Sequence, residues 1–251
     1  MALAGVYYTL VKGTVYGNNY SLMFSNTDDL SYFAREFDGN PVKNHGAVCN
    51  THDAANAQLF DTWTDLYDGI NNANVLLDNI DKAEFPEDKE YIRQRIKGET
   101  KFLRAYYHFL LVQGWYEVPI RTETVTDIAT SSKAATPHAE ALDWIIQEME
   151  DCIDMVDDKE YDKSPSHVKK TIVEGILARV CLWRAGYPSE GGQPFYEKAA
   201  KYAKAVYDSK KHKLYQNDIY AIWKMMASDQ YDPEYLSLIH ISEPTRLRRI
   251  S

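Results

Sequence analysis

Apolar residues recur at intervals of three and four positions through most of this sequence, a spacing that predicts α-helices. The clearest case is the range 63–80, where Trp63, Leu66, Ile70 and Leu77 fall on one helical face. The same spacing predicts helices over 1–12, 55–82, 87–113, 138–157, 167–185 and 195–209, and a short one over 219–226. No strong strand or hairpin signal competes with it. We therefore expect an all-α fold made of antiparallel helix pairs.

Helix-breaking residues set the expected boundaries of these helices. Pro86 separates the second helix from the third, and Gly114 is expected to cap the third, because glycine commonly follows a helix C-terminus. Thr136 followed by Pro137 predicts an N-cap and a first-turn proline for the fourth helix. The triplets Leu-Arg-Ala at 103–105 and Leu-Ala-Arg at 177–179 lie about two 37-residue steps apart. That interval is close to the period of helical-repeat arrays.

Composition excludes several classes of function. The net charge of -9 and pI of about 5.3 argue against a nucleic-acid partner, which requires a basic face. No apolar run approaches the roughly 20 residues that span a bilayer, and no signal peptide is visible after Met1. The three cysteines, Cys49, Cys152 and Cys181, do not have the spacing of a zinc site. We expect them to be small buried hydrophobes, and pairing between Cys152 and Cys181 stays open.

No catalytic or cofactor motif is present in the sequence. The seven histidines form no metal-binding spacing, and there is no glycine-rich phosphate loop or nucleophile elbow. The carboxylates of the fourth helix fall mostly on its polar face, which predicts solvation; they include Glu148, Glu150, Asp151, Asp154, Asp157 and Asp158. We therefore expect a protein that is not an enzyme and that uses no cofactor and no metal.

Five residues on the apolar faces of the helices are expected to be structural. Trp63 is a core aromatic, and Asn74 is expected to be a buried amide bonded to the backbone of the next helix. Glu99 lies on the apolar face of the third helix, where a carboxylate requires a charged partner. Arg104 and Arg179 are the expected partners of Glu99 in a buried or half-buried pair.

Three segments carry a resemblance to a known family. They are WTDLYDGINNANVLLDNI (63–80), GETKFLRAYYHFLLVQGWYEVPI (98–120) and ILARVCLWRAGYP (176–188). In this order they resemble the SusD/RagB family patterns "W…Y..I..AN.LL..I", "GEAKFLRAYYYF.L…GDVPL" and "ALLARVYLY…AGY". The sequence departs from these patterns at Tyr116-Glu117, where the family usually has Gly-Asp.

The resemblance implies a tetratricopeptide-like array of antiparallel helix pairs with a long irregular N-terminal loop. It also implies a surface-exposed lipoprotein of the outer membrane, involved in polysaccharide utilisation, that passes oligosaccharides or peptides to a SusC-like TonB-dependent transporter. Members are about twice as long, so we expect the lipid anchor, which is the only membrane attachment, and the C-terminal half to lie outside this sequence. The resemblance covers about 1–235. Residues 236–251 look like a translated sequencing adapter, so we expect a non-native tail that packs poorly.

The stretch 13–54 is the expected ligand-binding loop, because it is rich in turn residues and unusually long for a compact domain. Its polar groups can hydrogen-bond sugar hydroxyls, and its aromatic rings can stack on a sugar. The candidates are Asp28, Asp29, Arg35, Asn40, Asn50 and His52 as polar groups, and Tyr16, Tyr20 and Phe37 as stacking rings.

Two alternatives remain open at this point. A helical-repeat scaffold that binds a protein partner would share the helices, although plain repeat scaffolds keep their loops short. An all-helical glycoside hydrolase would require two carboxylates placed across a bound sugar. The sequence favours the nutrient-binding protein over both.

Overall fold

A computed structural model of the protein describes residues 2–20, 52–127, 131–157, 167–212 and 220. Its α-helices are α1 (Ala2–Val11), α3 (Ala57–Asn79), α4 (Glu90–Trp115), α6 (His138–Cys152), α7 (Lys170–Ala185) and α8 (Gln193–Ser209). Short 3-10 turns are η1 (Ile80–Lys82), η2 (Glu87–Lys89) and η3 (Ile153–Met155). The described residues contain no strand, only a single antiparallel bridge between Val118 and Thr136. The all-α prediction is confirmed.

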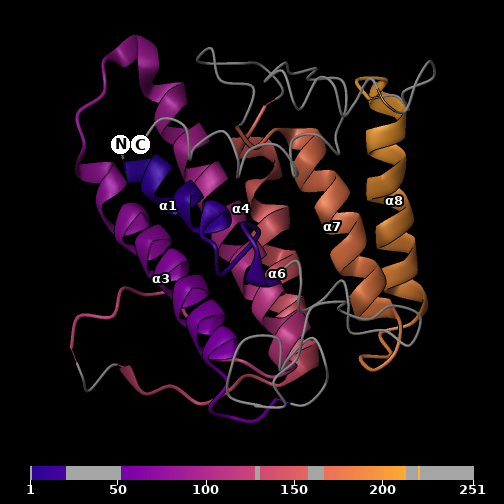
Figure 1. Ribbon diagram of the computed structural model, residues 1–251. Helices are drawn as coiled ribbons and strands as arrows, with labels where there is room; N and C mark the ends of the chain where they lie inside the picture. The colour runs from indigo at the N-terminus through magenta and orange to yellow at the C-terminus, as the bar shows by residue number, and fades with distance from the viewer. Residues whose placement is uncertain (1, 21–51, 128–130, 158–166, 213–219, 221–251) are drawn as a thin grey trace.

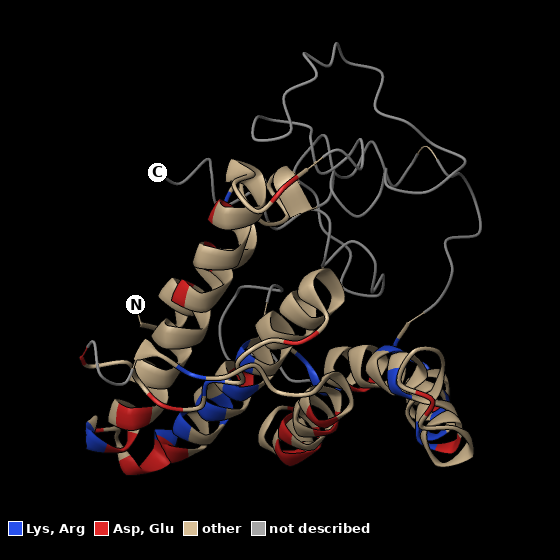
Figure 2. Ribbon diagram, turned by 90° about the horizontal axis from the view of Figure 1, so that it is seen from below, with Lys and Arg blue, Asp and Glu red and all other residues tan. Residues whose placement is uncertain are grey.

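The helices stand side by side in chain order, from α3 at one end to α8 at the other (Figure 1). Each helix of the series α3, α4, α6, α7 and α8 packs on the next, and α1 packs on both α3 and α4. This succession of neighbouring helices is the tetratricopeptide-like array that was expected. Some of the described helices carry both acidic and basic residues, whereas α3 carries aspartates and no lysine or arginine (Figure 2).

Helix α4 is the centre of the hydrophobic core. Every residue from 102 through 112 is buried, because α1, α3 and α6 all pack against this helix. A helical segment that is buried on all sides lies in the interior of a protein rather than at its surface. Phe102, Tyr107 and Phe109 are at most 3% exposed and belong to one continuous core cluster with residues of the other helices.

Two glycines allow these helices to approach closely. A Cβ atom at Gly69 would lie 2.7 Å from Oγ1 of Thr9 in α1 and 2.9 Å from Cε2 of Tyr107 in α4. At Gly98 it would lie 2.7 Å from Cβ of Met155 in η3. These separations are too short for non-bonded atoms, so the packing of α1, α3 and α4 at Gly69 requires a residue without a side chain.

The ends of two helices differ from the sequence prediction. Helix α4 continues through Gly114 to Trp115, and Tyr116 is its C-cap with φ 67° and ψ -73°. The N-cap of α6 is Pro137 rather than Thr136. Thr136 instead donates its backbone N–H to the carbonyl of Val118, at 3.0 Å, so it joins the bridge that closes the loop between α4 and α6.

Cys152 and Cys181 are both buried free thiols, which resolves their open pairing. Burial raises the pKa of Cys152 to about 12 and that of Cys181 to about 11.

None of the described helices combines the length and the apolar character that crossing a bilayer requires. Three predicted segments lie outside the described residues: the tail 236–251, most of the loop 13–54, and all of the helix predicted over 219–226 except residue 220.

Candidate functional site: a cavity beside helix α3

The structure describes three of the nine ligand-binding residues expected from the sequence. His52 is exposed, five residues before α3 begins. Tyr16 and Tyr20 follow α1 and lie against α4. The other six lie outside the described residues and stay predictions: Asp28, Asp29, Arg35, Phe37, Asn40 and Asn50.

Tyr16 and Tyr20 are held by the core rather than presented to solvent. The Tyr16 and Tyr106 hydroxyls hydrogen-bond each other, and their rings stack with centroids 6.5 Å apart. Tyr20 is 6% exposed and donates to the Leu110 carbonyl at 3.3 Å. Burial raises the pKa of all three phenols above its ordinary value. These contacts favour an anchoring role for Tyr16 and Tyr20, which tie the chain after α1 to α4, over the expected stacking role.

Glu99 is fully buried, as its position on the apolar face predicted, but its partners differ from those expected. Its carboxylate accepts a hydrogen bond from the Tyr7 hydroxyl at 2.6 Å and lies 2.7 Å from Nδ1 of His167. Arg95, one helical turn earlier, is its guanidinium partner at 3.3 Å. The prediction that Arg104 and Arg179 pair with Glu99 was therefore wrong, and Arg179 is an exposed residue of α7.

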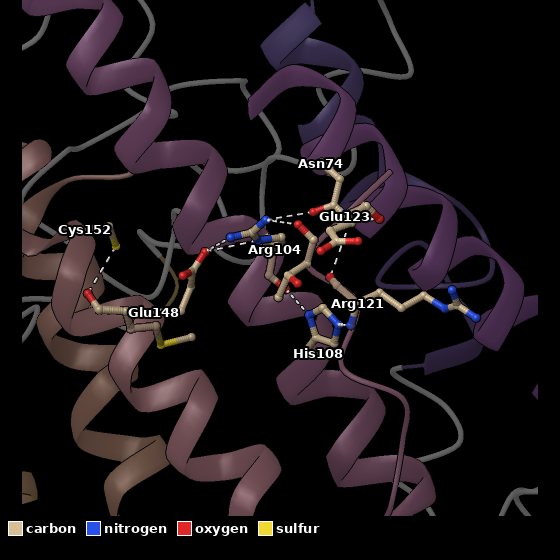
Figure 3. A network of polar contacts seen from close by, with 9 residues as sticks. Asn74, Arg104, His108, Arg121, Glu123, Glu148 and Cys152 are labelled. Carbon is tan, nitrogen blue, oxygen red and sulfur yellow. Dashed lines mark hydrogen bonds and ion pairs between the residues drawn. The ribbon is translucent and has the colours of Figure 1, made fainter. Parts of the chain in front are cut away.

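Arg104 instead joins α4 to α3 and α6 (Figure 3). Its Nη1 donates to Oδ1 of Asn74 at 2.8 Å, and its Nε donates to Oε1 of Glu148 at 3.1 Å. Glu148 is 8% exposed, so the prediction that it is solvated was wrong. Asn74 is buried and bonded to backbone, as expected. However, its amide donates to the carbonyl of Glu123, at 2.9 Å, rather than to the next helix.

His108 pins the segment that follows α4 (Figure 3). Its Nδ1–H donates to the Arg104 carbonyl at 2.9 Å, and its Nε2 accepts from the backbone N–H of Arg121 at 3.0 Å. The two bonds require the neutral ring, because a protonated Nε2 cannot accept. Burial lowers the pKa of His108 to about 3.

The pinned segment and α3 line an open cavity of about 500 Å³. One wall is the exposed edge of α3, and the other is the extended chain that runs from Pro119 to Val125. The lining residues are Trp63, Thr64, Tyr67, Asp68, Ile70, Asn71, Asn74, Pro119, Arg121, Glu123 and Val125. Trp63, expected in the core, is only partly buried and lines this cavity.

Aromatic rings and polar groups share the wall that α3 contributes. The rings of Trp63 and Tyr67 lie one helical turn apart with centroids 4.9 Å apart, and Trp115 packs against Trp63 at 5.3 Å. The Tyr67 hydroxyl donates to the Pro119 carbonyl at 2.8 Å, which ties the two walls together. A cavity that combines fixed aromatic rings with a few polar groups is suited to binding a small amphipathic molecule.

Metal chemistry finds no support in the described part of the chain. No group of three His, Cys, Asp or Glu residues gathers there in a way that could hold a metal ion. The buried ionisable residues form ion pairs inside the helix array: Arg104 pairs with Glu148, and Glu99 pairs with Arg95. The cavity offers aromatic rings and polar side chains that can contact a ligand.

Residues 3–182 match the sequence model of a protein family described as "SusD-like_3: Starch-binding associating with outer membrane". The chain belongs to this SusD-like family. A curated family relative, SusD-like protein P25 of Formosa agariphila, is 31% identical over 126 residues, which are 49% of this chain and 24% of that protein.

Solved structures of SusD-like proteins have the same fold. A SusD homolog from Bacteroides thetaiotaomicron superposes with a TM-score of 0.81 at 24% identity, over 93% of this chain and 44% of that one. A laminarin-binding SusD-like protein gives a TM-score of 0.74 at 22% identity, over 92% of this chain and 48% of that one. The chain thus spans about a quarter of the curated relative and a little under half of these structures.

Sequence reasoning assigned the α3 wall of the cavity to the core. Trp63, Tyr67 and Asn74 lie on the apolar stripe of this helix, and that stripe alone does not distinguish packing from a cavity wall. The opposite wall comes from residues 119–125, about 50 positions later. In the sequence, only the four-residue spacing of Trp63, Tyr67 and Asn71 indicates that these lining residues share one face of the helix.

Proposed function

We propose that the complete protein binds oligosaccharides, or less commonly peptides, at the cell surface and delivers them to a TonB-dependent transporter of the SusC-like type. The observation that carries this proposal is membership of the SusD-like family, whose description names starch binding and the outer membrane. The laminarin-binding structural relative supports the same class of ligand. Attachment to the membrane would come from a lipid anchor rather than from a helix of this array.

The cavity beside α3 adds physical support for a sugar ligand. Pyranose rings present an apolar C–H face and a rim of hydroxyl groups, and they therefore bind aromatic rings flanked by polar side chains. Trp63 and Tyr67 offer the rings, and Asp68 and Asn71 offer the polar groups. The cavity volume lies within the range of roughly 300–1,000 Å³ found for small-molecule sites.

A panel of glycans and peptides tests the binding step on the complete protein. We expect an oligosaccharide to bind, to change the tryptophan fluorescence and to be recovered intact. Cleavage that increases with protein concentration, and that a carboxylate substitution abolishes, would contradict a function limited to binding. Binding of peptides with no binding of any glycan would show that the ligands are peptides and not oligosaccharides.

A separate experiment tests the delivery step. We expect a gene for a TonB-dependent transporter directly upstream of the gene for this protein, and co-purification of the two products from outer membranes. Failure to co-purify both with and without the bound glycan would contradict the transporter as partner and leave the binding proposal intact.

A further inference from the structure

We infer that the cavity between α3 and residues 119–125 is a saccharide-binding site of the helical scaffold itself, and that it takes an uncharged segment of a glycan in preference to an anionic one. The inference rests on the proposed function. It adds a location for the site on the helix array, which differs from the N-terminal loop expected from the sequence. It also specifies the charge of the preferred ligand.

The aromatic wall is held rigidly in place before any ligand binds. Trp115 packs edge-on against Trp63, with 72° between their rings, and the Tyr67 hydroxyl is bonded to the Pro119 carbonyl. The rings of Trp63 and Tyr67 are tilted by 53° to each other and form an angled surface. Rigid rings lose little conformational freedom when a ligand binds, so such a surface favours affinity.

The polar groups that remain available next to these rings can satisfy sugar hydroxyls. The Asp68 side chain is 60% exposed. Oδ1 of Asn71 accepts from the N–H of Val125 at 3.2 Å, which leaves its amide nitrogen without a partner among the described residues. Thr64 offers little, because its hydroxyl donates to the Phe60 carbonyl. One carboxylate that accepts from hydroxyls and one amide that donates to them therefore face the same space.

The charge around the cavity disfavours an anionic ligand. Its lining contains two carboxylates, Asp68 and Glu123, and one cation, Arg121. The Arg121 guanidinium donates to the carbonyl of Ser131. Helix α3 contains four aspartates and no lysine or arginine.

The Lys12 ammonium group lies 3.8 Å from a carboxylate oxygen of Asp68 and 2.5 Å from one of Asp65. Its charge is therefore already compensated by two carboxylates. The lining has one more carboxylate than cation, so a uronate or sulfate group would face a net negative charge, and juxtaposed like charges weaken binding.

Calorimetric titration of the complete protein with neutral and uronate-containing oligosaccharides of matched length tests the inference. The neutral panel covers gluco-, manno-, galacto- and xylo-oligosaccharides. We expect a neutral member to bind at least about tenfold more tightly than the uronate series. Asp68→Asn and Asn71→Ala should each weaken neutral binding roughly fivefold. The first replaces a carboxylate acceptor by a weaker, neutral amide oxygen, and the second removes an amide donor.

The matched control is Asp61→Asn, which removes an exposed carboxylate of the same helix outside the cavity lining. It should leave affinity unchanged, and both aspartate variants should keep the wild-type melting temperature. Asn71→Ala also loses the hydrogen bond from the N–H of Val125, so its melting temperature should fall slightly. Unchanged neutral-sugar affinity in both Asp68→Asn and Asn71→Ala, or tighter binding of the uronate series, would overturn this inference alone. Absence of binding to every glycan would overturn the proposed function as well.

Discussion

Arg104 holds three parts of the chain together through one guanidinium group. It binds Asn74 of α3, Glu148 of α6 and the carbonyl of Thr122, and it projects from α4 between them. A buried ion pair is not in itself strongly stabilising, but removing one partner leaves a buried charge without compensation. Removing any member of this network therefore costs stability, because it leaves the buried polar or charged groups of its partners without a hydrogen bond.

Asn74→Leu should lower the free energy of unfolding by about 3 kcal/mol, although leucine is similar in size to asparagine. The substitution removes the acceptor of the Arg104 Nη1–H and the donor to the Glu123 carbonyl. Urea unfolding measures the loss. Asn72→Leu, at an exposed position of the same helix, is the control and should change stability by less than about 0.5 kcal/mol. Equal effects of the two substitutions would contradict the network.

His108 makes stability depend on pH. Its folded-state pKa is about 3 and its unfolded value is near 6.5, so below pH 6.5 the unfolded chain binds a proton that the folded chain excludes. Its contribution is fully present above pH 6.5 and is lost as pH falls toward 3, at about 1.4 kcal/mol per unit. His108→Gln removes this dependence.

Urea unfolding of wild type and His108→Gln between pH 7 and 4.5 measures the difference. Below pH 6.5 the free energy of unfolding of the wild type should fall more steeply than that of His108→Gln, by about 1.4 kcal/mol per pH unit. Every other titrating group is common to both proteins. Parallel pH profiles would show that His108 is not a buried neutral ring.

Tyr116 occupies a γ-turn that favours glycine. Its φ is 67° and its ψ is -73°, and the N–H of Glu117 donates to the carbonyl of Trp115 at 2.8 Å. Its ring stacks on His138, with centroids 4.2 Å apart. A non-glycine residue in this region costs of order 1–3 kcal/mol. Glycine, which the sequence pattern given above has at this position, would adopt this backbone without that cost.

Tyr116→Gly should therefore be more stable than Tyr116→Ala by about 1 kcal/mol, since both lose the stack on His138 and only glycine relaxes the backbone. Thermal and urea unfolding compare the two. At Asn72 in the middle of α3 the order should reverse, with alanine the more stable. An alanine variant at 116 that equals or exceeds the glycine variant would contradict the strained turn.

At the scale of elements, the close packing of α1, α3 and α4 depends on Gly69. Gly69→Ala should lower the free energy of unfolding by about 1–3 kcal/mol, because the added methyl group meets Thr9 and Tyr107. Gly5→Ala in α1 is the matched control. No atom lies within 4 Å of its new Cβ, so it should raise stability by up to about 1 kcal/mol. Stabilisation by both substitutions would mean that the helices do not meet at Gly69.

The helices themselves could be predicted from the sequence, because apolar periodicity directly reflects which face is buried. Their ends were less predictable: Gly114 lies inside α4, and the backbone of Thr136 is used by the bridge to Val118. Burial of Glu99 and Arg104 followed from their positions, but their partners did not. Glu148 is 44 positions from Arg104, and only the packing of α6 on α4 brings them together.

At the scale of the whole molecule, a row of helices supplies a rigid frame, and the loops between them build the site. The cavity exists because His108 and Asn74 hold residues 119–125 against the edge of α3. The sequence shows its rings as part of an apolar stripe, whereas its shape depends on contacts between segments about 50 positions apart. The six loop residues that lie outside the described part of the chain stay predictions for the same ligand.

Equilibrium dialysis of the complete protein against oligosaccharides labelled at the reducing end tests the central claim most directly, because one sample reports both retention and chain length. We predict that a neutral oligosaccharide is retained on the protein side in a saturable manner and is recovered at its original length. Equal distribution of every oligosaccharide across the membrane, or recovery of shortened labelled products, would contradict the account.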